Sequence, residues 1–319
     1  MILSKRKNIF NELKEDDNEV FSSLNKKDLE YLLGLINLYK LSLRDKINVS
    51  TYETFGLEIE CEKANWDNLE KRVVGSWILT DDISLEDGAE IKSVPLTDTK
   101  ENWISLKNMC SIISKYAQVG MNSGEHVHIG IQALGEKDKS LINFMKLWGV
   151  YEHIIYRFSY GEFLGPRPGI KGSAKSVRID FFNSCYMYEN LCSTKEELLK
   201  YFAKEKSNAV NFTHYNTLKT LEFRCPNASL NPVIWQNNVN LFVKMMLYSK
   251  SDNFNNLLLD KRKHELLLKE KTPNEIYLND ALEFADLIFN NNLDKVYFLR
   301  QYLKSFEVSQ EYEMAKSFC

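Results

Sequence analysis

The sequence FGLEIE, at residues 55–60, alternates apolar and polar side chains with the period of a β-strand. Because every second residue of a strand points to the same face, Glu58 and Glu60 should share one face and the apolar residues the other. Two later stretches repeat the pattern, GEHVHIG at 124–130 and TLEFR at 220–224. The sequence therefore predicts three strands that each present a polar pair: Glu58 and Glu60, His126 and His128, and Glu222 and Arg224.

These three pairs have the chemistry of a metal and phosphate site. Several buried carboxylates are costly without a compensating cation, and glutamate oxygens suit Mg²⁺ or Mn²⁺, with imidazole tolerated beside them. Same-face residues of one strand are about 7 Å apart, so two carboxylates can serve two neighbouring ions. Arg224 stays protonated and cannot bind a metal, but its planar guanidinium suits phosphate oxygens. The combination favours nucleotide chemistry.

Composition restricts the class of protein. The chain has 319 residues and a net charge of −3, which supports a sizeable core and argues against a dedicated nucleic-acid binder. No apolar stretch reaches the roughly 18 residues of a membrane span, and the start of the chain lacks the apolar region of a secretory signal. Six cysteines without a Cys-x-x-Cys pair indicate free thiols in a reducing compartment. We therefore predict a cytoplasmic protein without a membrane partner.

The pattern of elements divides the chain into three parts. Residues 1–48 and 251–319 have helical spacing of apolar residues, whereas residues 49–250 mix strands and helices. In the middle part we expect strands at 52–61, 77–79 and 89–94, and helices at 103–118, 138–158 and 232–248. Asn231 and Pro232 should cap the last of these, and another helix should begin at Thr272. Because βαβ regularity is missing, an α+β fold with an antiparallel sheet fits better than a doubly wound sheet.

In this order the motifs resemble those of the amidoligase family. That family belongs to the superfamily of ATP-dependent carboxylate–amine ligases that includes glutamine synthetase and glutamate–cysteine ligase. The matching pieces are Phe-Gly-x-Glu-x-Glu at 55–60, Trp77 with Asp82-Ile83-Ser84-Leu85, Glu90-Ile91, Gly-x-His-Val-His at 124–128, and Asn211 with Thr-x-Glu-Phe-Arg at 220–224. Two departures are Ser93-Val94-Pro95 where the family has Ser-Pro, and Asn227-Ala228-Ser229 where it has an Asn-Gly-Thr-like turn.

The resemblance implies a fold and a reaction. The fold is a curved antiparallel β-sheet with helices on its convex face, the catalytic fold of glutamine synthetase, here flanked by the two helical ends. In the implied reaction a substrate carboxylate attacks the γ-phosphate of ATP, and an amine then attacks the acyl phosphate to give an amide or isopeptide bond. ATP and Mg²⁺ or Mn²⁺ would be the cofactors. The acid and the amine, whether small molecules or peptides, stay open, as does homo-oligomerisation.

The resemblance also implies roles for individual residues. Glu58, His126 and Glu222 would hold one ion, and Glu60 and Glu90 a second, with Glu86 as a candidate third acid. Arg224 and His128 would contact the transferred phosphate. Lys175 and Arg178 of the basic loop 161–178 would bind the nucleotide, and Asp82 and Ser84 the substrate.

Simpler interpretations of the same residues stay open. The glutamate pair also fits a solvated strand face, the histidines a hydrogen-bonded core pair, and Glu222 with Arg224 a cross-strand ion pair. Asp82 and Ser84 fit an Asx turn equally well, and the histidines at 153, 214 and 264 receive no role. At the level of function, the alternatives are a metal-dependent hydrolase of phosphoesters or amides and a non-catalytic binding protein on the same scaffold.

Overall fold

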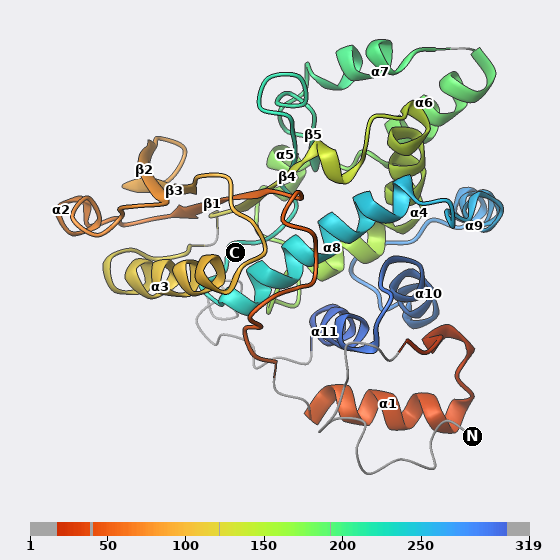
Figure 1. Ribbon diagram of the computed structural model, residues 1–319, viewed down its shortest axis with the longest axis horizontal. Helices are drawn as coiled ribbons and strands as arrows, with labels where there is room; N and C mark the ends of the chain where they lie inside the picture. Colours follow the sequence, from red (N-terminus) through yellow and green to blue (C-terminus); the bar gives the residue numbers. More distant parts are fainter. Residues whose placement is uncertain (1–17, 39–40, 121, 192, 305–319) are drawn as a thin grey trace.

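A mixed α+β fold built on one antiparallel sheet is seen in the computed structural model, which describes residues 18–38, 41–120, 122–191 and 193–304 (Figure 1). Within this part of the chain the sheet has six strands in the order β2-β3-β1-β4-β6-β5, and every neighbouring pair is antiparallel. The strands are β1 (Phe55–Cys61), β2 (Trp77–Asp82), β3 (Gly88–Ser93), β4 (Glu125–Gly130), β5 (Val210–Asn211) and β6 (Thr220–Phe223).

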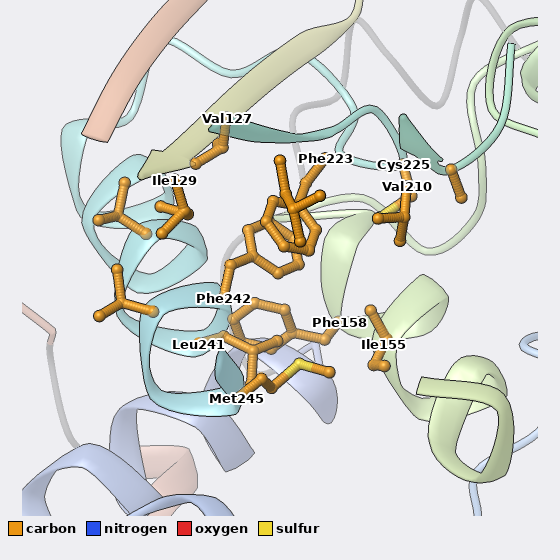
Figure 2. Close-up of a cluster of buried hydrophobic side chains, with 14 of the residues drawn as sticks. Val127, Ile129, Ile155, Phe158, Val210, Phe223, Cys225, Leu241, Phe242 and Met245 are labelled. Carbon is orange, nitrogen blue, oxygen red and sulfur yellow. The ribbon is translucent and has the colours of Figure 1, made fainter. Parts of the chain in front are cut away.

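One face of the sheet is apolar and is covered by three helices, α3 (Lys100–Tyr116), α4 (Asp138–Ser159) and α8 (Pro232–Lys250). Phe55 of β1 stacks on Trp103 of α3 with ring centroids 4.9 Å apart, and Phe223 of β6 stacks on Phe242 of α8 at 4.1 Å. Figure 2 shows the part of this core between β4, β6 and α8. Because strand residues alternate, this packing leaves the polar residues of β1, β4 and β6 on the opposite face.

The remaining helices surround this central layer. Figure 1 shows α1, α10 and α11 on the side of α8 that lies away from the sheet. Asn231 caps α8 with Pro232 at its first turn, as the sequence predicts, and Thr194 and Glu197 form a capping box at the start of α7. The bounds are η1 (Phe21–Ser23), α1 (Lys26–Leu38), α2 (Trp66–Leu69), η2 (Ile131–Ala133), α5 (Ile170–Ser173), α6 (Arg178–Leu191), α7 (Lys195–Phe202), α9 (Asn256–Leu268), α10 (Leu278–Ile288) and α11 (Asn292–Tyr302).

The α+β class and the antiparallel sheet are confirmed, but two predicted helices have different limits. The helical segment predicted up to residue 48 is wrong from residue 41 onward, because this stretch is irregular. The buried carboxylate of Asp98 accepts hydrogen bonds from the backbone N–H groups of Ile47 and Val49, so these groups need no helical partner. The helix predicted to begin at Thr272 begins at Leu278 instead.

Several smaller predictions concern residues on or near the core. The four described cysteines, at 61, 110, 185 and 225, are buried free thiols, as expected. Cys192 and Cys319 lie outside the described residues, as do residues 1–17 and 305–319 of the two predicted helical ends. No helix in the described part of the chain combines the length and the apolar character needed to cross a membrane.

Candidate metal centre

The register of the sheet brings the predicted polar residues into adjacent positions on one face. Glu58 of β1 lies opposite His126 of β4, and His128 lies opposite Glu222 of β6. On the other side of β1, Glu60 lies opposite Glu90 of β3. Residues that are more than 160 positions apart in the chain therefore share one polar surface, as the alternation of the three motifs predicts.

Glu58 is the centre of this cluster. Its Oε2 lies 3.1 Å from His126 Nδ1, and its Oε1 lies 3.3 Å from His128 Nε2. Burial alone would raise the pKa of Glu58, but hydrogen bonds and positive charge from His126 and His128 hold it far below the ordinary value of a glutamate. Glu58 is thus an ionised carboxylate, the form that a metal ion requires.

Two groups of side chains in the cluster have the spacing of metal ligands. One is Glu58, Glu90 and His126, and the other is Glu58, His128 and Glu222, each with ligand atoms within 4.8 Å of one another. Within the described part of the chain, the buried Nε2 atoms of His126 and His128 make no hydrogen bond of good geometry, although glutamate oxygens lie 3.4 and 3.3 Å away. A metal ion bound here would replace a proton of the imidazole that it binds, because a metal requires the neutral ring. Carboxylate oxygens with imidazole nitrogens form a donor set that fits Mg²⁺ or Mn²⁺.

The division between these groups differs from the predicted one. There, His126 joined Glu58 and Glu222, His128 contacted the phosphate, and Glu60 and Glu90 held a second ion; here the two histidines are exchanged. Glu60 belongs to neither group. Its Oε2 instead accepts a hydrogen bond from the backbone N–H of Gly124, and its Oε1 lies 3.4 Å from His126 Nε2. Glu86, the candidate third acid, is an exposed residue of the turn between β2 and β3 and also lies outside both groups.

Lys92 is a member of the cluster that sequence reasoning missed. It lies opposite Glu58 in the register of β1 and β3, with its Nζ 2.6 Å from Glu90 Oε2 and 3.5 Å from Glu58 Oε1. Burial and the neighbouring charge of Glu58 raise the pKa of Glu90 to about 7, although Lys92 acts against both. The signal was present in the sequence, because Lys92 follows Glu90 by two positions and so shares its face.

Arg224 lies at the β6 side of the cluster. Its Nη1 donates to Glu222 Oε1, and its Nε donates to the carbonyl of Ser173 in α5 at 3.1 Å. The other oxygen of Glu222 accepts a hydrogen bond from Asn211 Nδ2 at 2.6 Å. His214, which received no role from the sequence, has its ring centroid 6.0 Å from that of His128. The sequence pattern around His214 did not predict this position, because the residue lies in the loop between β5 and β6 and not in a strand.

Lys175 and Arg178, the predicted nucleotide contacts, lie in a different place. They line a cavity of about 490 Å³ whose described lining residues come from α4, Tyr160, the 166–178 segment and residues 270–274, and include no member of the Glu and His cluster. Arg178 Nε donates to the carbonyl of Gly149 at 3.1 Å, and Lys175 Nζ lies 3.4 Å from Glu205. Both cations are thus bound by groups of the protein, and α5 contributes both to this cavity and to the contact with Arg224.

Asp82 and Ser84 form the Asx turn that was the simpler interpretation. The Oδ1 of Asp82 accepts hydrogen bonds from the backbone N–H of Ser84 at 2.9 Å and from its hydroxyl at 2.6 Å. This turn joins β2 to β3 at the edge of the sheet, so the contacts of both residues are explained without a substrate.

Comparison with known proteins adds no family or relative: no protein-family model matches the chain, and a search of curated proteins gives no significant match.

Proposed function

We propose that this protein is an ATP-dependent ligase that joins a carboxylate to an amine and requires Mg²⁺ or Mn²⁺. The observation that carries the proposal is the convergence of Glu58, His126, His128 and Glu222 on one sheet face, with Arg224 beside them. The antiparallel sheet with helices on one face supports a glutamine synthetase-like form of the fold. The motifs that resemble the amidoligase family supply the reaction class.

The roles follow from the donor chemistry of each side chain. Glu58, His128 and Glu222 would hold a divalent ion, which would supply positive charge to the phosphate oxygens of the nucleotide. Two neighbours orient these ligands. Thr220 Oγ1 lies 3.4 Å from His128 Nδ1, and Asn211 donates a hydrogen bond to Glu222. Arg224 is held at the edge by the Ser173 carbonyl and offers a planar cation to the phosphoryl group.

The proposed reaction has two steps. First, a carboxylate oxygen of the substrate forms a bond to the γ-phosphorus of ATP while the bond to ADP breaks. The amine nitrogen then attacks the acyl carbon, phosphate leaves with the original carboxylate oxygen, and the nitrogen loses a proton. Fixed positive charge around the transferred group is the main contribution expected of the protein, because a phosphoryl transfer requires little covalent help from side chains.

The test follows that carboxylate oxygen. Purified protein is incubated with ATP, Mg²⁺ and panels of amines and of ¹⁸O-labelled carboxylic acids, and the released phosphate is analysed by mass spectrometry. One ¹⁸O atom in the phosphate is expected with the right acid, because the oxygen that attacked the phosphorus leaves with it. Substitution of Glu58 by Gln should abolish the signal, whereas the same change at Glu125, on the opposite face of β4, should preserve it.

Other results of this experiment would contradict the proposal. Phosphate release without ¹⁸O under every combination would indicate simple ATP hydrolysis. Cleavage of phosphoesters or amides in the absence of nucleotide would favour a metal-dependent hydrolase. Failure of a non-hydrolysable ATP analogue with Mg²⁺ to raise the melting temperature would exclude nucleotide binding, because a ligand that binds only the native state must stabilise it.

A further inference from the structure

The two groups of metal-ligand spacing differ in what already lies between their members. In the group of Glu58, Glu90 and His126, the Lys92 ammonium bridges the two carboxylates at 2.6 and 3.5 Å. In the group of Glu58, His128 and Glu222, the neighbouring cation is Arg224, whose Nη1 donates to Glu222 and whose Nε donates to the Ser173 carbonyl. A compact point charge thus contacts both carboxylates of the first group, whereas a tethered planar cation contacts one carboxylate of the second.

The second group also has the better support for a metal ion. Thr220 holds one ring nitrogen of His128, whose Nε2 faces Glu58 Oε1 at 3.3 Å. Asn211 and Arg224 each hold one oxygen of Glu222. Outer partners of this kind fix the orientation of metal ligands. Among the described residues, the buried Nε2 of His128 has no hydrogen-bond partner of good geometry.

The position of Lys92 also bears on the number of ions. A second divalent ion in the first group would lie within a few ångströms of the Lys92 ammonium, in contact with the carboxylate that it binds. Repulsion between these two cations disfavours an ion in the first group.

We infer that Lys92 takes the place of a second metal ion. The cluster binds one divalent ion, at Glu58, His128 and Glu222, and the ammonium of Lys92 is a permanent cation of the site that neutralises Glu90 and excludes an ion from the first group. Lys92 has this role only in a site that binds an ion, so the inference rests on the proposed function. Because the Lys92 side chain is 37% exposed, its ammonium is also accessible to an anionic group bound on this face.

The number of bound Mn²⁺ ions tests this inference without any measurement of turnover. The full chain is titrated with Mn²⁺ in the absence of nucleotide, and free Mn²⁺ is followed by electron paramagnetic resonance. We expect one ion in the wild type and two in Lys92→Met, which removes the charge and keeps the length of the side chain. Lys92→Arg should keep one ion, and Lys107→Met, the same change at an exposed site on α3, should also keep one.

A double variant locates the second ion. Lys92→Met combined with Glu90→Gln should return to one ion, because the carboxylate uncovered by the first change is lost with the second. Circular dichroism shows that each variant is folded. If Lys92→Met does not fold, anomalous scattering from wild-type crystals soaked in Mn²⁺ gives the same information, as one peak beside His128 and none beside Glu90.

The possible failures are distinguishable. Two ions in the wild type, or one ion in folded Lys92→Met, would overturn the role of Lys92 and leave the ligase proposal intact. An anomalous peak beside Glu90 would also overturn it. Complete failure of the wild type to bind Mn²⁺ would overturn this inference together with the metal requirement of the proposed function.

Discussion

Strand β4 carries two neighbouring polar residues that face opposite sides of the sheet, and their surroundings differ in kind. His126 faces the cluster, where buried acids are accompanied by histidine, lysine and arginine. Glu125 faces the helices, where its Oε1 accepts a hydrogen bond from Asn238 at 2.7 Å and its Oε2 has no partner among the described residues. Burial raises the pKa of Glu125 well above its ordinary value, and the nearby carboxyl of Glu162 raises it further, against a lowering by Asn238.

The comparison teaches that the partner of a buried acid, not its residue type, decides what the acid can do. Glu125 is fully buried, and burial favours its neutral form by raising its pKa, so it is a poor metal ligand. Glu58 is also largely buried, but the two histidines keep it ionised. A count of buried carboxylates would therefore treat the two faces alike, whereas the cations on one face distinguish them.

The largest expected effect is a loss of Mn²⁺ affinity on substitution of the polar face but not of the apolar face. Glu58→Gln removes the ligand shared by both groups, so we expect Mn²⁺ affinity to fall at least ~100-fold, the upper end of the loss seen for residues that only support ligands. Glu125→Gln makes the same change on the same sheet and should leave the affinity unchanged. Isothermal titration calorimetry measures both. Equal losses in the two variants would mean that the faces are not functionally distinct.

Metal binding should also stabilise the fold through the polar face. At a Mn²⁺ concentration of about 100 times the dissociation constant, the free energy of unfolding should rise by about 2.7 kcal/mol. The wild type and Glu125→Gln should both respond, and a chelator should reverse the change. Urea unfolding with and without Mn²⁺ provides the measurement. A stabilisation of the same size in Glu58→Gln would place the ion elsewhere.

For the apolar face, we predict how the free energy of unfolding depends on pH. Because the folded pKa of Glu125 is raised, the folded protein keeps a proton that the unfolded chain releases, and wild-type stability falls as pH rises above the unfolded pKa of about 4.3. Gln resembles the protonated acid and has no proton to lose. Glu125→Gln should therefore match the wild type near pH 4 and exceed its unfolding free energy by about 1–3 kcal/mol at pH 8. If the stability difference between Glu125→Gln and the wild type shrinks as pH rises, Glu125 is not protonated in the folded protein.

Sequence reasoning could predict the polar face because a strand has a period of two residues. This period placed Glu58, His126 and Glu222 correctly with no knowledge of the register, since each motif needed only its own alternation. The same rule could have found Lys92, which was passed over because a lysine does not fit a list of metal ligands.

Other features of the site depend on contacts that no local pattern encodes. His214 reaches His128 through a loop, and the partners of Lys175 and Arg178 lie at residues 205 and 149. The hydrogen-bond partner of Glu125 is Asn238, more than a hundred positions away. The irregular path of residues 41–54 likewise depends on Asp98, whose buried carboxylate replaces helical hydrogen bonds.

The smallest expected effect concerns a third environment, the partly exposed acid of the β2–β3 turn. Ser84→Ala removes the hydroxyl bound to Asp82 but keeps the hydrogen bond from the backbone of residue 84, and the site is exposed. We therefore expect the free energy of unfolding to fall by no more than about 0.5 kcal/mol, with no change in Mn²⁺ affinity. Chemical unfolding and calorimetry measure the two quantities. Loss of Mn²⁺ affinity would connect this turn to the metal centre, while a raised KM for the acid or amine at unchanged stability would restore the substrate contact that the sequence predicts.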